Sequence, residues 1–150
     1  CEPIELGTKL SKLIKRGWRN VIKKPSLLFN HREINIKTQF DLHHGYGVLE
    51  KAISVMDEKD KIDFKDFVNK NTKYNPHIMF ISKKGILNNF FKDQFKWLFK
   101  CEKIFGFKNL KGYDQKRLYA FLAERYMPFW FRKYSKIIEW PWVFSDTHLK

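Results

Sequence analysis

Residues 86–105 have the sequence ILNNFFKDQFKWLFKCEKIF, and this stretch decides the class of fold that the chain can adopt. Apolar residues recur in it every three or four positions, at Leu87, Phe91, Phe95, Leu98, Cys101 and Phe105. Such a stripe is typical of a helix, and the following Gly106 is suited to end it because glycine tolerates the backbone of a helix cap. The stretch therefore predicts one long helix with an apolar stripe.

Further apolar stripes predict four more helices, at residues 8–24, 49–56, 63–69 and from 112 onward. We expect Thr8 to cap the first of these helices and Pro25 to end it, and Pro128 to kink or end the last one. A short continuous apolar run at residues 78–81 predicts a buried strand. The predicted fold is α+β and predominantly helical, with about five helices around one short buried strand.

The composition describes a basic chain with enough apolar residues for one folded domain. Of its 150 residues, 30 are Lys or Arg and 16 are Asp or Glu, which gives a net charge of +14; 43% are hydrophobic and 17% aromatic. An aromatic content this high excludes a disordered polycation, and residues 1–150 fit a single domain or a fragment. The charge suits nucleic acid, an anionic membrane surface or anionic substrates. No RRM, KH or zinc-finger pattern is present, so nucleic acid is not an expected partner.

Secretion and membrane insertion are not expected. No apolar run reaches the length of a membrane span, and the start of the chain does not resemble a signal peptide, which favours the cytoplasm. The chain begins with Cys rather than Met, which indicates a processed product or a part of something longer. Cys1 and Cys101 are too few for a disulfide framework, so we expect both thiols to be inert.

The predicted basic amphipathic helix at residues 8–24 contains no acidic residue. Its apolar positions are Leu10, Leu13, Ile14, Trp18, Val21 and Ile22, and its candidate membrane-binding residues are Lys9, Lys12, Lys15, Arg16, Trp18, Arg19 and Lys23. On an anionic bilayer, the apolar side chains would enter the headgroup layer and the cations would contact phosphates. The alternative is a helix that packs on the core of this protein and leaves its basic face in solvent.

Few polar residues are candidates for chemistry, because the common catalytic and phosphate-binding motifs are absent. His43 and His44 follow an aspartate, but a metal ion would need further ligands such as His77, and we predict no metal site. Arg125 lies in register with the apolar stripe of its helix, so it requires either an ion-pair partner on another helix or a phosphate or carboxylate ligand. The adjacent Glu124 could take a proton from a hydroxyl group. Because adjacent helix residues do not face each other, we expect these two to have different partners.

Four segments of the chain, taken in order, are similar to the motifs of one bacterial family. They are Gln39-Phe40-Asp41-Leu42-His43-His44, Asn75-Pro76-His77-Ile78-Met79-Phe80-Ile81-Ser82-Lys83-Lys84, Phe95-Lys96-Trp97-Leu98-Phe99 and Arg117-Leu118-Tyr119-Ala120-Phe121-Leu122-Ala123-Glu124-Arg125. Members carry a histidine after a helix with an aromatic residue, a Met-Phe-Ile strand followed by Lys, a Trp-Leu-Phe helix and a Glu-Arg helix. The chain thereby resembles, over roughly residues 34–144, the glycosyltransferase-like family of capsular-polysaccharide and lipopolysaccharide biosynthesis, long filed as a domain of unknown function.

The resemblance implies a fold like the C-terminal part of a GT-A glycosyltransferase. Such an enzyme transfers a sugar from a nucleotide-sugar donor to a hydroxyl of a capsule or lipopolysaccharide glycan. By position, Glu124 is then the catalytic base, and the substrate-binding residues are Arg125, His43, His44, Asn75 and His77. The cofactor stays open, with the divalent metals Mn or Mg allowed beside the nucleotide sugar, and the location is cytoplasmic, peripheral to the inner membrane. The alternative is a non-catalytic basic module that binds anionic membrane or nucleic acid.

Two features depart from the pattern of that family. Three residues separate Asn75 from Met79, whereas the family has asparagine directly before methionine. No nucleotide-sugar site is recognisable in residues 1–33. The resemblance therefore implies the acceptor-side part of a longer enzyme, or a shortened relative.

Overall fold

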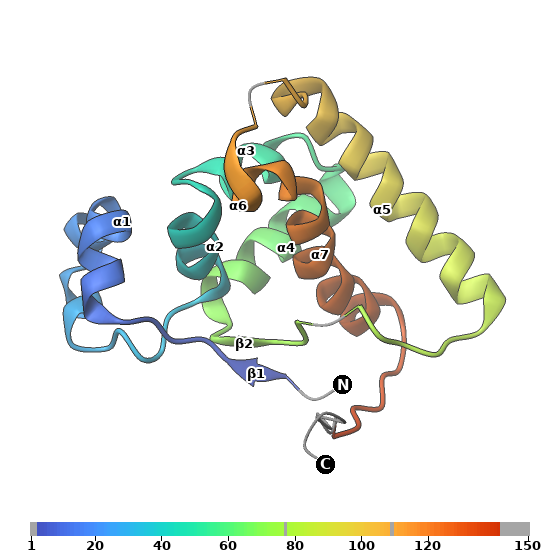
Figure 1. Ribbon diagram of the computed structural model, residues 1–150. Coiled ribbons are helices and arrows are strands. Elements are labelled where there is room, and N and C mark those ends of the chain that lie inside the picture. The colour runs from blue at the N-terminus through green and yellow to red at the C-terminus, as the bar shows by residue number, and fades with distance from the viewer. Residues whose placement is uncertain (1–2, 77, 109, 142–150) are drawn as a thin grey trace, which may run out of the picture.

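The computed structural model describes residues 3–76, 78–108 and 110–141, and these residues are predominantly helical (Figure 1). The helical elements are α1 (Leu10–Lys23), the 3-10 turn η1 (Pro25–Leu28), α2 (Ile36–His44), α3 (Val48–Ser54), α4 (Glu58–Lys70), α5 (Lys84–Phe105), α6 (Gly112–Lys116) and α7 (Leu118–Tyr134). The strands β1 (Ile4–Glu5) and β2 (Lys73–Tyr74) form a small antiparallel sheet. The predicted class, α+β and predominantly helical, is confirmed.

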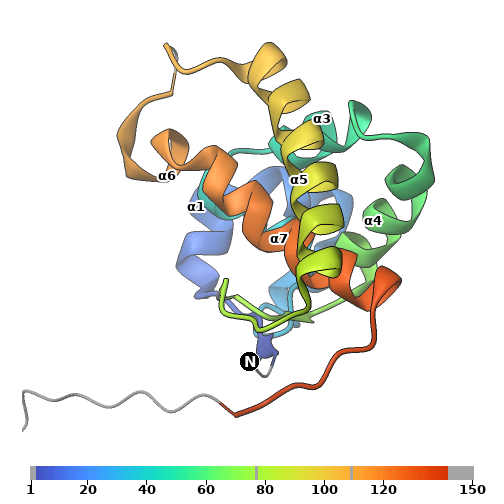
Figure 2. The same cartoon turned by 90° about the vertical axis from the view of Figure 1, so that its right-hand side faces the viewer.

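The helix α7 occupies the centre of the arrangement (Figures 1 and 2). It packs along the long helix α5 on one side and contacts α4 on another. The helix α2 packs against α4, and α1 packs against both α2 and η1, so α1 forms the edge of the molecule opposite α5 (Figure 1).

The core is rich in aromatic rings and joins four helices. Phe64 on α4 is fully buried, and its ring centroid lies 5.6 Å from that of Trp97, 5.8 Å from Tyr126 and 5.0 Å from Phe129. The indole Nε1 of Trp97 donates a 2.8 Å hydrogen bond to the carbonyl of Ala52 on α3. Buried rings of this size dominate the energetics of a core, so this cluster holds α3, α4, α5 and α7 together.

The ends of α1 and α5 can be compared with their sequence signals. As predicted, α1 ends two residues before Pro25, and α5 ends at Gly106, whose φ of +59° is a conformation that favours glycine. The expected cap by Thr8 is wrong, because Lys9 occupies the N-cap position of α1 and makes no side-chain cap bond.

The helix α7 continues through Pro128 to Tyr134, so of the two effects expected of this proline, a kink or an end, the end is excluded. A proline inside a helix removes one hydrogen bond and costs about 3 kcal/mol. Phe129 and Trp130, which follow it directly, are both buried in the core, and their burial offsets that cost. The single helix predicted from residue 112 is instead two helices, α6 and α7, which are separated at Arg117.

The buried strand predicted at residues 78–81 is wrong. This segment is irregular, and Ile78, Met79 and Ile81 are exposed. Only Phe80 packs inward, with its ring centroid 5.8 Å from that of Phe90 and 5.0 Å from that of Phe131. The run lacks a partner strand to satisfy its backbone, because the sheet of the described residues lies at β1 and β2 instead.

The apolar stripes in the sequence predict helices correctly but not which face is buried. On α5 the buried residues are Phe90, Gln94, Trp97 and Cys101, whereas Phe91 and Phe95 of the predicted stripe are exposed. Both helices α1 and α5 carry large apolar residues on more than one face, so periodicity alone does not select the inner one.

Candidate functional site

Two of the four segments quoted for the resemblance, residues 39–44 and 117–125, are far apart in sequence but meet where α2 contacts α7. His44 on α2 is buried, and its ring stacks on that of Phe121 on α7 with the centroids 4.2 Å apart. Phe40, one helical turn earlier, also lies beside it, with the ring centroids 4.4 Å apart. We call this contact the α2–α7 joint; it comprises Gln39, Phe40, His43 and His44 on α2 and Phe121, Glu124 and Arg125 on α7.

Arg125 is the most enclosed charged side chain of the joint, with 3% of its side chain exposed. Its Nη2 donates to Gln39 Oε1 at 2.8 Å, and its guanidinium lies 4.8 Å from the ring centroid of Tyr74 on β2. Burial disfavours the charged form and lowers the pKa of Arg125 from its usual value. Its Nε has no acceptor among the described residues, and a buried donor left unpaired costs about 1–3 kcal/mol.

Glu124 and Arg125 form an ion pair with each other, which corrects the expectation that they have different partners. Arg125 Nη1 donates to Glu124 Oε2 at 2.8 Å. Although adjacent Cβ atoms diverge on a helix, the arginine side chain is long enough to reach back to its neighbour. Glu124 keeps 21% of its side chain exposed, and its Oε1 makes no hydrogen bond among the described residues. One carboxylate oxygen is therefore anchored and the other is available.

Basic side chains border the joint on two sides. Lys12 of α1, one of the predicted membrane-binding residues, has its Nζ 3.0 Å from His43 Nε2. A lysine ammonium only donates, so Nε2 must accept, and the proton of the neutral imidazole then sits on Nδ1. On the other side, the guanidinium of Arg117 lies 5.5 Å from the ring centroid of Phe121. The joint thus combines an available carboxylate oxygen with positive charge nearby.

Asn75 lies apart from this cluster of polar groups. Its Nδ2 donates to Glu139 Oε1 at 3.2 Å, and its Oδ1 accepts from Arg132 at 3.5 Å. It lines an apolar groove of about 880 Å³ between the 78–82 segment, the end of α7 and residues 135–140. The structure therefore brings His43, His44, Glu124 and Arg125 together at the α2–α7 joint and places Asn75 elsewhere. His77 lies outside the described residues.

The predicted membrane-binding residues divide into two groups on α1. Lys12 contacts His43 on α2, and Arg19 and Lys23 lie 5.5 and 5.3 Å from the ring centroid of Tyr46, in the turn after α2, although both remain exposed. The others, Lys9, Lys15, Arg16 and Trp18, are exposed as well and take no part in these contacts.

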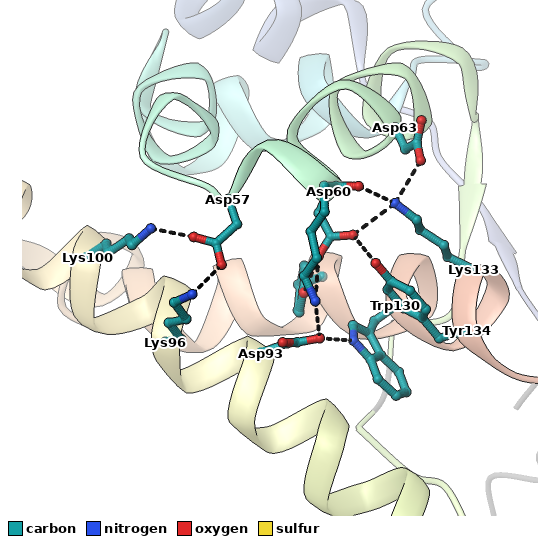
Figure 3. Close-up of polar contacts among 11 residues, drawn as sticks. Asp57, Asp60, Asp63, Asp93, Lys96, Lys100, Trp130, Lys133 and Tyr134 are labelled. Atoms are coloured by element: carbon teal, nitrogen blue, oxygen red, sulfur yellow. Dashed lines mark hydrogen bonds and ion pairs between the residues drawn. The ribbon is translucent and has the colours of Figure 1, made fainter.

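A second polar cluster, which sequence analysis missed, fastens α4 to α5 and α7 (Figure 3). Asp60 is buried and accepts hydrogen bonds from Tyr134 at 2.6 Å, Lys133 at 3.0 Å and Tyr126 at 3.2 Å. Burial alone would lower the pKa of Lys133, but its bonds to Asp63 and Asp60 outweigh burial and raise it. Every group in this cluster is paired within the protein, so we assign it a structural role.

Gln39 in the joint, and Tyr74 and Arg117 beside it, are residues to which sequence analysis did not assign a role. Arg117 lies four and eight residues before Phe121 and Arg125, and Gln39 lies four residues before His43. Positions four apart share a helical face, so this spacing carried the signal for both. Tyr74 has no such signal, because only the pairing of β1 with β2 brings it to Arg125.

Within the described ranges, no three His, Cys, Asp or Glu side chains are grouped so that they could hold a metal ion. Cys101 is buried, and burial raises the pKa of its thiol to about 12, so the thiol stays protonated. Of the helices in residues 3–141 that the structure describes, none has the length and apolar character needed to cross a bilayer.

Comparison with known proteins identifies the domain. Residues 8–135, from just before α1 to just after α7, match a family described as a domain of unknown function, DUF4422. The chain belongs to this family. No curated protein and no solved structure matches it significantly.

Proposed function

We propose that this chain is the acceptor-side part of a glycosyltransferase that builds a bacterial capsule or lipopolysaccharide glycan. The observation that carries the proposal is the α2–α7 joint. Two segments that resemble glycosyltransferase motifs, about 80 residues apart, are in direct contact through the His44–Phe121 stack and the Gln39–Arg125 hydrogen bond.

In the proposed reaction, Glu124 is the general base. Its Oε1 accepts the hydrogen of an acceptor hydroxyl while Arg125 holds Oε2 and fixes the orientation of the carboxylate. The hydroxyl oxygen attacks the anomeric carbon of the donor sugar, and its proton passes to Glu124. The bond from that carbon to the diphosphate breaks, and the nucleotide diphosphate leaves with the bonding electrons.

Positive charge near the joint supports the departure of the diphosphate. Lys12, through its contact with His43, and Arg117, over Phe121, supply positive charge beside the joint. A leaving group that gains negative charge is stabilised by such preorganised cations. Arg125 is buried, so it acts as a positioning residue for Glu124 rather than as a direct phosphate ligand. The resemblance allows Mn or Mg with the nucleotide sugar, but no step of this proposal runs through a metal.

The test is nucleotide release from a panel of nucleotide sugars, with a bacterial membrane-lipid extract as acceptor. It is run with this chain and with its complete gene product. Glu124→Gln keeps an oxygen near Arg125 but removes the base, so we expect turnover to fall about 10²- to 10⁴-fold. Glu124→Asp keeps the charge but retracts the carboxylate, and we expect an intermediate loss.

The matched control is Glu58→Gln on α4, which removes an exposed carboxylate paired with Lys61 and should leave turnover unchanged. Thermal unfolding of each variant separates loss of activity from loss of fold. Turnover that survives Glu124→Gln would overturn the role of Glu124. Absence of nucleotide release from every donor, by the chain and by the complete gene product, would overturn the transferase proposal and favour the non-catalytic basic module.

A further inference from the structure

The helix α1 exposes a line of large apolar side chains along its whole length. Leu10, Ile14, Trp18 and Ile22 follow one another at steps of four residues and are 40%, 55%, 52% and 68% exposed. We call these four residues the apolar stripe of α1. Positions four apart share a helical face. The non-helical backbone of Gly17, with φ of −112° and ψ of 15°, kinks α1 between Ile14 and Trp18, so Leu10 and Ile14 form one exposed pair and Trp18 and Ile22 form a second.

The stripe lies outside because α1 packs by a different and narrower face. The buried residues of α1 are Leu13, Gly17 and Asn20. A Cβ atom on Gly17 would lie 2.5 Å from Cδ2 of Leu42, so glycine allows α1 to approach α2 this closely. With that face turned inward, the described part of the protein leaves the apolar stripe uncovered.

The charges on α1 indicate what kind of surface can cover the stripe. Seven basic and no acidic residues lie between positions 7 and 24. Among the described residues, no carboxylate lies within 4 Å of the charged groups of Lys9, Lys15 or Arg16, which are exposed. The guanidinium of Arg19 lies 5.3 Å from the ring centroid of Trp18, which places a cation directly beside the stripe. A covering surface must therefore be apolar in part and anionic in part.

We propose that α1 docks this chain on an anionic lipid bilayer. The helix lies in the plane of the membrane, with the apolar stripe at the boundary of headgroups and acyl chains and with Lys9, Lys15 and Arg16 on lipid phosphates. Phe29, which follows η1 beside α1, is 86% exposed and adds to the apolar surface. Nucleic acid would neutralise the cations but leave the stripe in water, and a second copy would set one basic helix against another. The proposal is independent of Glu124 and of any transferase activity.

The test is co-sedimentation of the chain with phosphatidylcholine vesicles that contain or lack phosphatidylglycerol. We expect binding that requires phosphatidylglycerol and weakens with salt. The double variant Trp18→Ser/Ile22→Ser should lower the partition coefficient about ten- to a hundredfold, because it removes two large apolar groups. The double variant Lys15→Glu/Arg16→Glu should lower it at least about tenfold.

Matched controls come from α5, at the opposite edge of the molecule. Phe95→Ser/Phe99→Ser changes two exposed apolar residues four positions apart, and Lys83→Glu/Lys84→Glu reverses two exposed charges. Neither should reduce vesicle binding by more than about twofold, since neither touches α1. Circular dichroism of all four double variants checks that the helices are retained.

Three results would overturn the proposal. The first is absence of binding to the phosphatidylglycerol vesicles, or equal binding to both kinds of vesicle. Binding of a DNA duplex that Lys15→Glu/Arg16→Glu abolishes would in that case identify nucleic acid as the partner. The second is loss of vesicle binding in the α5 variants rather than in the α1 variants. The third is a dimer in solution, detected by light scattering, that Trp18→Ser/Ile22→Ser converts to a monomer, because a second copy would then cover the stripe.

Discussion

The helices α1 and α5 both expose a line of large apolar side chains, yet they differ in what surrounds that line. Phe91, Phe95 and Phe99 form the exposed line of α5, and two lysines of that helix, Lys96 and Lys100, are paired with Asp57 at the N-cap of α4. The helix α5 also carries acidic residues of its own, whereas α1 carries basic residues and no acidic one. Exposure of apolar residues alone is thus a weak sign of a docking surface, whereas its combination with charge of one sign along the whole helix is a more specific one.

The two helices also differ in how firmly they are held. On its inner face α5 inserts Phe90 and Trp97 into the aromatic core, whereas α1 attaches through Leu13, Gly17 and Asn20. Burial of large rings contributes far more to stability than contact through a glycine. The molecule therefore consists of a firmly packed part around α4, α5 and α7 and a more lightly attached basic edge at α1.

The same substitution on the two helices gives the largest expected difference. Trp97→Ala removes a buried ring and its hydrogen bond to Ala52, so we expect the free energy of unfolding to fall by about 3–5 kcal/mol. Trp18→Ala removes an exposed ring and should change it by less than about 0.5 kcal/mol. Urea denaturation of both variants measures the difference. Equal losses would show that α1 is as deeply packed as α5.

The buried carboxylate Asp60 supplies the next largest effect. Asp60→Asn leaves Lys133 without one of its two carboxylate partners and disturbs the bond from Tyr134 (Figure 3). It also disturbs the bond from Tyr126. We expect the free energy of unfolding to fall by about 2–3 kcal/mol. This is below the usual range for a broken buried ion pair, because Lys133 is partly exposed. Asp66→Asn breaks the exposed pair with Lys70 and is the control, with an expected change within about 0.5 kcal/mol. A loss for Asp60→Asn as small as that for Asp66→Asn, in the same denaturation assay, would mean that the cluster does not fasten α4 to α7.

Local sequence signals predicted most of the helices but missed α2, and tertiary contacts decided which surfaces are inside. The stripe at Leu49, Ala52, Ile53 and Met56 is buried as its spacing predicts, because α3 has apolar residues on one face only. On α1 and α5 the periodicity fits more than one face, and the packing of neighbouring helices selects the inner one. The apolar run at residues 78–81 was misassigned for a related reason, since a strand needs a partner that local sequence does not reveal.

The candidate site was predictable in part. The position of Arg125 on a buried helical face follows from its register with Leu118 and Leu122, and its need for a partner follows from its charge. The identity of that partner depends on how Arg125 reaches back to Glu124 and across to Gln39, which no spacing rule fixes.

The smallest expected effect concerns the pH dependence of the pairing between α4 and α5. Hydrogen bonds from Lys100 and Lys96 lower the pKa of Asp57 to about 2 from its usual value of 3.8. The native state therefore binds the proton of this carboxyl less readily than the unfolded state does, so the stabilisation is fully present above pH 4 and is lost as the pH falls through 2. Asp57 is partly exposed, so solvent screening keeps the contribution below about 1 kcal/mol.

The measurement is the free energy of unfolding of the wild type and of Asp57→Asn from pH 6 to pH 2. The two curves should be separated above pH 4 and should converge toward pH 2, because the wild-type carboxylate becomes neutral there. Lys15→Gln on α1 is the matched control: with no carboxylate within 4 Å among the described residues, its curve should run parallel to the wild type throughout. A Lys15→Gln curve that converges with the wild type in the same pH range would show that Lys15 is neutralised within the fold, as Lys96 and Lys100 of α5 are. The contrast between Lys15 and these two paired lysines would then no longer hold.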